Sequence, residues 1–459
     1  MNRGNMRGWL AVALVLAGAG IVRGDDRALL VGHGPDFRDT VRSAKNRVFP
    51  AVVFVKCIRD TYEEGKKRAQ EVSGSGVLIS PAGELLTNWH VIDKAVEVRC
   101  LLYDGRAMNA RVVGSDKDTD LALLQLDVPE GAGDLPYAPL GGSANLEEGD
   151  FVMAMGAPWG LSRSVSIGII ACTRRYLPGN SEYSLWLQTD CAISPGNSGG
   201  PLVNTRGEVI GINSRGYLMG GDLAFAVPSD TVAFVVDQLR THGEVRWSWT
   251  GLELQPLRDF NRNTYFEGTQ GVIVASTDPE SPARAAGLQP RDRILSVNGR
   301  AMNALTEEDL PAIRTWLGLL PVDQPVQVRF QRNDAEQTCQ MIPREKGRVE
   351  GDSYDCKRWD LTVKTINQFE NPELHFHRQE GVFVYSVKYP GNAAGSGLQT
   401  NDIILKVDGR DVRTLDDLQQ IHTTLVEKVD ERHRVVFTVL RNGLMRQVVL
   451  DFLRDYERE

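Results

Sequence analysis

A serine in a glycine-rich segment is the first group in this 459-residue chain that could act as a nucleophile. Ser198 lies in the stretch AISPGNSGGPL, residues 192–202. Glycine, proline, asparagine and serine are common in surface turns, so composition alone favours a turn without chemistry. A serine hydroxyl is a weak nucleophile at neutral pH, and it needs a base that takes its proton and a third group that orients this base. The rest of the chain must supply both.

One histidine and one aspartate could complete such a site. His90 is the single histidine between residues 34 and 241, so it is the candidate base. Asp120 directly precedes the apolar stretch LALLQL, where a buried acid must be hydrogen-bonded or paired. Two earlier acids, Asp116 and Asp118, are expected to be solvated turn residues. The order of the candidates along the chain is that of chymotrypsin-type enzymes: His90 as base, Asp120 as orienting acid, Ser198 as nucleophile.

Acyl transfer through Ser198 would also need backbone N–H donors for the oxyanion that forms. The glycine two residues before the serine gives the backbone the freedom that such a turn requires. The predicted oxyanion hole comprises Gly196, Asn197 and Ser198. The amides of Gly196 and Ser198 are the candidate donors, and Asn197 lies between them.

Short apolar segments separated by glycine-rich turns must position these groups. About ten to twelve of them run from Ala51 to about Pro228, which predicts an all-β barrel or sandwich. The charged residues 58–72 interrupt two of these segments and are predicted to form an exposed loop. Residues 229–243 have helical spacing, with Ser229 and Asp230 able to cap the helix and Gly243 to end it.

A repeat follows the predicted barrel. The segment GVIVASTDPESPARAAGLQPRDRILSVNGRAM begins at Gly271, and GVFVYSVKYPGNAAGSGLQTNDIILKVDGRDV begins at Gly381. This ungapped match at one constant offset predicts a duplicated domain. The polar residues 344–353 are the expected linker. A chain of this length is also too long for a single core.

The beginning of the chain predicts export. Residues 1–24 combine two arginines, an apolar run and small residues before two aspartates, as in a secretory signal peptide cleaved near Gly24. An uncleaved anchor is the alternative, and either one places the rest of the chain outside the cytoplasm. The net charge of −8 gives no electrostatic reason to expect nucleic acid as a partner.

Neither metal nor cofactor is predicted. The six cysteines contain no Cys-x-x-Cys pattern that would indicate a zinc or dithiol site. Disulfides Cys172–Cys191 and Cys339–Cys356 are the pairings to test first, and free buried thiols are the alternative. His375 and His377 could share one strand face and hold a metal, but an ordinary exposed pair is the expectation.

Four motifs resemble those of the HtrA/Deg family of extracytoplasmic serine proteases: TNWHVI, DTDLALLQL, SPGNSGGPLVNTRGEVIGINS and LAFAVP. That family joins a trypsin-like double barrel to one or two C-terminal PDZ domains, and the resemblance covers nearly the whole chain after the signal. It therefore implies a mainly-β, chymotrypsin-like fold. The implied domains are an N-terminal segment over 25–48, a protease domain over 49–243, and PDZ domains over 248–345 and 355–455.

The resemblance also implies a function. It is that of an ATP-independent serine endopeptidase of the cell envelope, periplasmic or secreted, which cleaves unfolded or damaged proteins and assembles as a homotrimer or a multiple of trimers. Phe37 and Phe49 are candidate contacts in such an assembly. Two alternatives stay open, a non-catalytic chaperone or peptide-binding scaffold and a signalling protease with one dedicated substrate.

The substrate pocket is expected to be small, apolar and uncharged. Ala192 stands six residues before Ser198, at the position where trypsin-like enzymes carry the acid that selects lysine or arginine. The resemblance implies valine or alanine before the scissile bond. Ile193 and Phe225 could also line the pocket, and a core position is the alternative for both.

The two repeats resemble PDZ domains, which bind an extended C-terminus by strand addition and hold its carboxylate on backbone amides. In the first repeat WTGLELQPL matches the carboxylate-binding loop, and the second repeat has Asp360 and Leu361 in place of the central residues. Because Asp360 would repel a carboxylate, we expect the first repeat to bind peptide ends and the second to assemble or pack. The candidate peptide-binding residues are Thr250, Gly251, Leu252 and Glu253.

Overall fold

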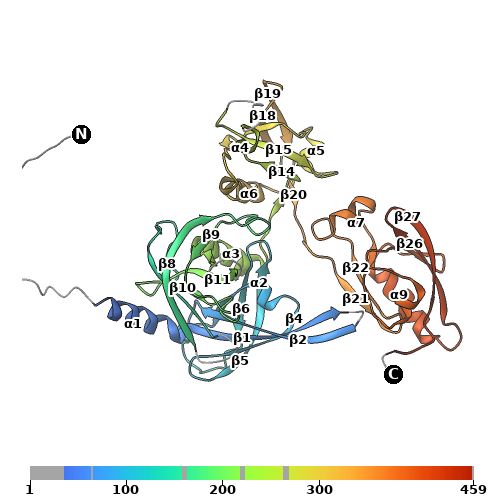
Figure 1. Ribbon diagram of the computed structural model, residues 1–459, viewed down its shortest axis with the longest axis horizontal. Helices are drawn as coiled ribbons and strands as arrows, with labels where there is room; N and C mark the ends of the chain where they lie inside the picture. Colours follow the sequence, from blue (N-terminus) through green and yellow to red (C-terminus); the bar gives the residue numbers. More distant parts are fainter. Residues whose placement is uncertain (1–35, 64–65, 158–162, 218–222, 262–267, 457–459) are drawn as a thin grey trace, which may run out of the picture.

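The computed structural model describes residues 36–63, 66–157, 163–217, 223–261 and 268–456. The predicted signal peptide, residues 1–24, lies outside the described residues. Three lobes follow one another along the chain, a double barrel and two smaller sheet domains (Figure 1). The predicted mainly-β architecture is therefore confirmed. No helix in the described ranges is long and apolar enough to cross a membrane.

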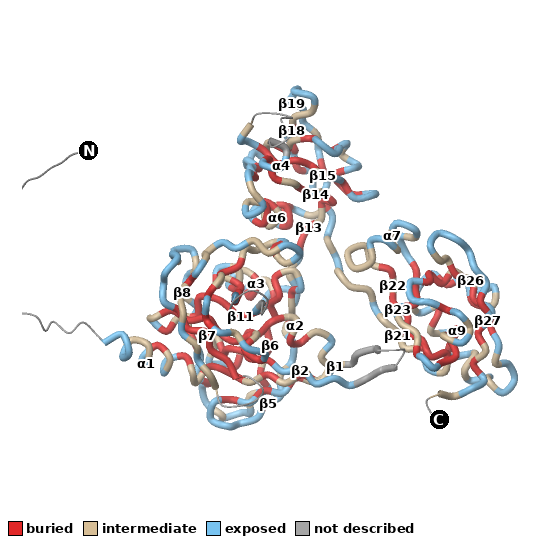
Figure 2. Tube along the Cα trace, in the orientation of Figure 1, coloured by how far each residue is buried: buried red, intermediate tan, exposed pale blue. Residues whose placement is uncertain are grey.

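Two closed six-stranded barrels form the first lobe. The first has the strand order β1-β2-β3-β6-β5-β4 and the second β10-β11-β12-β9-β8-β7. The main apolar core extends into both barrels and a smaller one lies in the second barrel, and the buried residues fill the interior of this lobe in Figure 2. The strands are β1 (Val52–Glu63), β2 (Lys66–Leu78), β3 (Glu84–Thr87), β4 (Ala95–Leu101), β5 (Ala107–Asp116), β6 (Leu121–Leu126), β7 (Phe151–Gly156), β8 (Ser164–Arg175), β9 (Trp186–Thr189), β10 (Pro201–Asn204), β11 (Val209–Tyr217) and β12 (Leu223–Pro228).

The loop prediction for residues 58–72 was wrong. Strands β1 and β2 continue through this segment as a long antiparallel hairpin, paired from Val52↔Val77 to Glu63↔Lys66. Two contacts between its strands involve charged side chains: Lys56 pairs with Glu71 at 2.8 Å, and the guanidinium of Arg59 donates to Gln70 Oε1. Such cross-strand pairs stabilise a solvent-exposed ladder in which apolar alternation is missing. The hairpin projects beyond the barrel in Figure 1.

In the part of the chain that the structure describes, three α-helices accompany the barrels: α1 (Phe37–Val48), α2 (Trp89–Ile92) and α3 (Ser229–His242). The predicted helix α3 is confirmed, and Gly243 ends it in the left-handed region at φ 76°. Its N-cap is Pro228 rather than Ser229. Phe37 is half-exposed and packs on the equally exposed Phe151, with ring centroids 4.7 Å apart, whereas Phe49 packs against the core.

The second lobe, at the top of Figure 1, is a small sheet of order β14-β15-β16-β18-β19. Its two ends meet where β13 pairs with β20. The elements are β13 (Ser248–Trp249), β14 (Leu252–Gln255), α4 (Leu257–Asn261), β15 (Val272–Thr277), α5 (Pro282–Ala285), β16 (Arg293–Val297), β17 (Arg300–Ala301), a 3₁₀ turn η3 (Glu307–Asp309), α6 (Leu310–Gly318), β18 (Val326–Arg332), β19 (Ala335–Met341) and β20 (Arg344–Glu345).

The third lobe repeats this plan with one additional strand at the edge. Its sheet has the order β21-β22-β23-β24-β26-β27. The elements are β21 (Ser353–Cys356), β22 (Leu361–Thr365), α7 (Pro372–His377), β23 (Val382–Val387), α8 (Asn392–Ser396), β24 (Ile403–Val407), β25 (Arg410–Asp411), α9 (Leu415–Glu427), β26 (Arg434–Arg441) and β27 (Leu444–Asp451).

This architecture corrects one smaller expectation and decides between the two alternatives left open for the cysteines. His375 and His377 lie on helix α7, not on a strand, and residues two apart on a helix do not face each other. All six cysteines are free thiols, so neither of the two disulfides considered first is formed.

Candidate active site

His90 and Asp120 meet although 30 residues separate them in the chain. His90 lies on the short helix α2, which directly follows strand β3, and Asp120 stands at the start of β6, the neighbour of β3 in the barrel. The Nδ1 atom of His90 is 2.9 Å from both carboxylate oxygens of Asp120. The backbone N–H of His90 also donates to Asp120 Oδ1, at 3.1 Å. The carboxylate of Asp120 thus holds His90 both by its ring and by its main-chain N–H.

Asp120 is buried, and both its carboxylate oxygens and its main-chain carbonyl oxygen accept hydrogen bonds. The hydroxyl of Ser214 on strand β11 donates to Asp120 Oδ2 at 2.5 Å. The main-chain carbonyl of Asp120 accepts hydrogen bonds from Asn88 Nδ2 and from the N–H of Trp89. Asp120 adopts a left-handed backbone conformation, with φ 57°, a region that aspartate tolerates better than most residues. These bonds offset the cost of burying the carboxylate.

Sequence reasoning did not find Ser214. Besides its bond to Asp120, its main-chain carbonyl accepts the hydroxyl hydrogen of Ser198, with an Oγ–O distance of 2.9 Å. In this structure the Ser198 hydroxyl therefore donates to Ser214 and not to the imidazole of His90. Ser214 joins the three candidate residues through two direct contacts. The signal available in the sequence was a polar pair, Asn213 and Ser214, inside the otherwise apolar strand VIGINS.

The segment before Ser198 forms a tight turn. The N–H of Asn197 donates to Ser194 O at 2.9 Å, and Gly196, the third residue of the turn, has φ 99°. A positive φ at this position is typical of a type II turn. Because the amide of Asn197 is used within the turn, it is not free for a substrate. The amides of Gly196 and Ser198 donate to no acceptor among the described residues.

Strand β2 of the first barrel holds this turn in place. The Ser75 hydroxyl donates to the carbonyl of Gly196 at 2.6 Å and accepts the N–H of Ala157 at 2.8 Å. The main-chain N–H of Ser75 donates to Ser198 O at 2.8 Å. The orientation of the turn therefore depends on contacts between the two barrels.

A cavity of about 520 Å³ opens beside Ser198. Ala192 and Ile193 line it, as predicted for a substrate pocket, together with Leu223 and Ala224. Phe225 does not line this cavity, because its side chain is buried in the main core. The expectation of an uncharged pocket was wrong, since Arg215 is also part of the lining.

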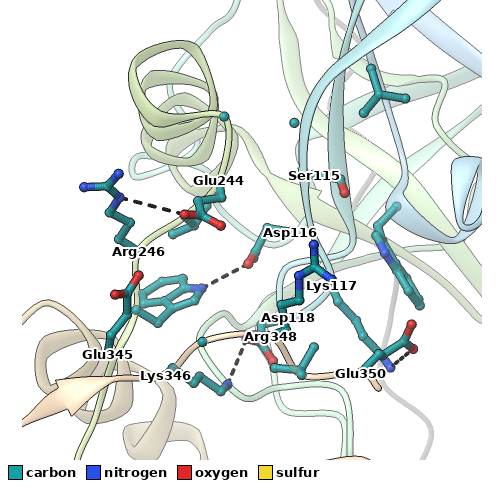
Figure 3. A pocket seen from close by; sticks show the side chains of 18 of the residues that line it. Ser115, Asp116, Lys117, Asp118, Glu244, Arg246, Glu345, Lys346, Arg348 and Glu350 are labelled. Carbon is teal, nitrogen blue, oxygen red and sulfur yellow. Dashed lines mark hydrogen bonds and ion pairs between the residues drawn. The ribbon is translucent and has the colours of Figure 1, made fainter. Parts of the chain in front are cut away.

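A second cavity, of about 700 Å³, is lined by Asp116, Lys117 and Asp118 of the loop that leads to Asp120 and by residues 345–353 (Figure 3). Asp116 on this loop is buried: Thr119 donates to its Oδ2 from both backbone and side chain, and Trp247 Nε1 donates to Oδ1 at 3.0 Å. Burial raises the pKa of Asp116 to about 6, with a contribution from the nearby charge of Asp118, while the donors from Thr119 and Trp247 lower it.

Asp118 makes the contact that joins this loop to the segment after β20. Lys346 Nζ, which is nearly buried, lies 2.8 Å from Asp118 Oδ2 and 3.1 Å from the hydroxyl of Tyr183. Tyr183 in turn stacks on Trp247, with centroids 4.1 Å apart. The interpretation of Asp116 and Asp118 as solvated turn residues was therefore wrong. Thr119 and Trp247 contact the buried Asp116, and Lys346 of the linker pairs with the half-buried Asp118.

In the second lobe the predicted peptide-binding residues surround the start of β14. Gly251 has φ 67°, and a Cβ atom there would lie 2.2 Å from Ser281 Cβ, so only glycine fits. Thr250 is buried, Leu252 is half-buried and Glu253 is exposed, 3.9 Å from Arg314 on α6. Strand β14 pairs with β15 only, which leaves its other edge open among the described strands.

The third lobe differs at this place in three ways. Asp360, not Leu361, occupies the position of Gly251, because the same main-chain hydrogen bond is made at both places. The N–H of Lys388 donates to Asp360 O, as the N–H of Asp278 donates to Gly251 O. The alignment of the two repeats therefore shifts by one residue at this point. Asp360 has φ 57° and pairs with the buried Lys388, at 3.4 Å. Its Oδ2 also accepts the N–H of Asn392 at 2.9 Å.

Strand β21 covers the edge that is open in the second lobe. It pairs along its whole length with β22, from Ser353↔Lys364 to Cys356↔Leu361. Tyr354 on β21 also reaches helix α9, where its hydroxyl lies 2.9 Å from His422 Nδ1. The groove between β22 and α9 is therefore occupied by a segment of the same chain.

Two closed barrels with a histidine–aspartate pair and a serine-bearing turn between them define a trypsin-like serine protease. The trypsin-like peptidase domain model matches residues 74–212, and the PDZ domain model matches residues 250–342 and 361–451.

The chain is also similar to named proteins. It is 33% identical over 407 residues to a periplasmic serine endoprotease, DegP-like, of Hahella chejuensis (85% of this chain, 82% of the relative). It is 35% identical over 378 residues to one from Marinomonas sp. (81% and 77%). The HtrA-type protease AlgW, solved with a tripeptide, superposes with a TM-score of 0.60 at 31% identity, covering 68% of this chain and 98% of that one. The serine endoprotease of Yersinia pestis gives a TM-score of 0.52 at 31% identity (66% and 97%).

The chain belongs to the HtrA family of DegP-like periplasmic serine endoproteases. The resemblance inferred from the four motifs is thereby confirmed, as is the periplasmic location.

Proposed function

We propose that Ser198, His90 and Asp120 carry out peptide hydrolysis through an acyl-enzyme. The observation that supports this most strongly is the contact of His90 Nδ1 with both carboxylate oxygens of Asp120 at 2.9 Å. This contact commits Nδ1 to the acid and leaves Nε2 as the nitrogen that can take a proton. His90 would remove the Ser198 proton during attack and return it to the leaving amine, while Asp120 stabilises the imidazolium.

The first step would require a rotation of the Ser198 side chain. Its hydroxyl now donates to Ser214 O, and it must turn toward His90 before attack. Catalytic hydrogen bonds are often absent in a free enzyme and form only with substrate. The oxyanion would be stabilised by the amides of Gly196 and Ser198, because that of Asn197 is engaged with Ser194.

We propose further that the substrates are unfolded or damaged proteins and that their C-termini bind the first PDZ domain. The open edge of β14 can accept an extended peptide by strand addition, and the loop at Gly251 can present amides to its carboxylate. The second PDZ domain would not bind in this way, because β21 already pairs with β22 and Asp360 brings a carboxylate of its own.

A trimeric assembly built from the protease domains completes the proposal. The exposed aromatic pair of Phe37 and Phe151 is a surface that a neighbouring copy could cover. Analytical ultracentrifugation of the wild type and of Phe37→Ser tests this, and a wild type that sediments as a monomer contradicts it.

Cleavage of unfolded casein by the mature protein and by Ser198→Ala tests the catalytic proposal. We expect complete loss of cleavage in the variant, and loss of covalent labelling of Ser198 by a fluorophosphonate. Binding without cleavage by both proteins would favour a scaffold or chaperone. Cleavage of a single envelope protein, with casein untouched, would favour a dedicated signalling protease.

A further inference from the structure

The cavity beside Ser198 is lined by apolar residues, by three serines and by one cation. Its apolar lining includes Ala192, Ile193, Leu223 and Ala224, and its serines are Ser194, Ser198 and Ser214. Arg215 is the single charged residue in the lining, and no acidic residue lines the cavity in the described part of the chain. A guanidinium attracts an anion, and this attraction is stronger where the surroundings are less polar than bulk water.

The position of Arg215 is fixed by its neighbour on strand β11. Ser214 directly precedes it, and Ser214 donates to Asp120 and accepts the Ser198 hydroxyl. The ladder between β11 and β12 shifts register at this point, so that Asn213 pairs with Ala226 and Arg215 with Phe225. Arg215 is therefore adjacent in sequence to Ser214, the residue of β11 that is hydrogen-bonded to both Ser198 and Asp120.

The guanidinium of Arg215 has no hydrogen-bond or ion-pair partner among the described residues. Its Nε atom is buried and makes no hydrogen bond, and Arg215 forms no ion pair with any described residue. Other arginines of the second barrel do have acceptors: Arg175 donates to Gln188, and Arg206 to Glu208. A buried donor without an acceptor is unfavourable, and a ligand that supplies the acceptor removes this penalty.

We propose that Arg215 binds a carboxylate of the substrate in this cavity, so that the protease favours substrates that bring an acidic group beside the scissile bond. The proposal rests on the catalytic role proposed for Ser198. A carboxylate matches a guanidinium with two parallel hydrogen bonds, which a neutral amide cannot do. Its source is either an aspartate or glutamate side chain or the free C-terminus of a bound chain.

Quenched fluorescent peptides that differ only at the residue before the scissile bond test the side-chain source. For the wild type we expect kcat/KM to be about tenfold higher with glutamate than with glutamine, which has the same shape without the charge. In Arg215→Ala this ratio falls to about one, whereas cleavage of the valine peptide changes by less than about threefold. Arg215→Lys retains part of the preference, and Arg206→Ala, which removes an exposed arginine of the same barrel, retains all of it.

The second arm uses short peptides that end at the cleavage site as a free acid or as an amide. Stronger inhibition by the acid in the wild type, and its loss in Arg215→Ala, assigns the carboxylate to a chain end. A glutamate preference in the first arm assigns it to a side chain, and either result supports the proposal. It is overturned if the wild type discriminates in neither arm, or if Arg215→Ala discriminates as the wild type does.

Fluorophosphonate labelling separates this inference from the proposed function. A wild type that is labelled at Ser198 and cleaves the valine peptide, but ignores carboxylates, overturns only the role of Arg215. A wild type that is neither labelled nor active overturns the catalytic proposal, and the role of Arg215 falls with it.

Discussion

The hydroxyl of Ser75 in the first barrel donates a 2.6 Å hydrogen bond to the carbonyl of Gly196 in the second. This contact orients the peptide bond between Gly196 and Asn197, whose N–H points the opposite way, to Ser194. It thereby leaves the amides of Gly196 and Ser198 free in the turn. The proposed oxyanion site thus depends on a residue more than a hundred positions away in the chain.

We expect Ser75→Ala to lower kcat by about tenfold with little change in KM, because the turn loses the bond that holds its orientation. Ser73→Ala, two residues earlier on the same strand and exposed, is the matched control and should leave both constants unchanged. Steady-state hydrolysis of one peptide substrate measures the effect. An unaltered kcat in Ser75→Ala would show that the turn is held by its own residues.

Stability should depend on pH through Asp116. Burial raises its pKa in the folded protein to about 6, above the value of about 3.9 expected in the unfolded chain. The protonated carboxyl therefore stabilises the fold fully below about pH 4, and this contribution, about 3 kcal/mol, is lost as the pH rises to about 6.

The comparison of Asp116→Asn with the wild type isolates this effect. The Tm of the wild type relative to the variant should fall by several degrees between pH 4 and pH 7. Asp127→Asn, at an exposed position, should show no such shift. Parallel Tm profiles for Asp116→Asn and the wild type would mean that Asp116 ionises as in water.

The linker between the PDZ domains should be released when Lys346 is replaced. Lys346→Ala leaves Asp118 without its cation, and losing one partner of a nearly buried pair is more costly than losing an exposed one. In the inactive Ser198→Ala background we expect proteinase K to cut residues 344–353 about tenfold faster. Arg348→Ala is the control, because this side chain is 80% exposed and its one ion pair among the described residues is with Asp352. Equal cutting rates for both variants would contradict a docked linker.

Peptide binding should be confined to the first PDZ domain. Replacing Gly251 by valine places a side chain where Ser281 already stands, and it should abolish binding of an apolar C-terminal peptide to the full-length Ser198→Ala protein. Asp360→Gly, at the corresponding position of the second domain, should leave the affinity and the stoichiometry of one peptide per chain unchanged. Isothermal titration measures both, and two peptides per chain in the wild type would contradict the occupied groove.

The sequence by itself was sufficient to predict the fold class and the type of reaction. The alternation of apolar residues from Ala51 to Pro228 predicted the barrels, and the repeat after Gly271 predicted the duplicated domain, because period and self-similarity are local properties. His90, Asp120 and Ser198 became candidates because residue type, number and order along the chain restrict the choices.

Only the tertiary structure decided how these residues are supported. Ser75, Ser214 and Arg215 reach the site through strands that pair across the barrels, and no local pattern marks such contacts. The burial of Asp116 likewise involves Trp247, more than a hundred residues further along the chain, and that of Asp118 involves Lys346, more than two hundred residues further. The covered edge of β22 depends on which strand pairs with it, since main-chain hydrogen bonds between strands carry no side-chain signature. Composition sets what a segment can become, but long-range packing decides which groups are desolvated, paired or left free to act.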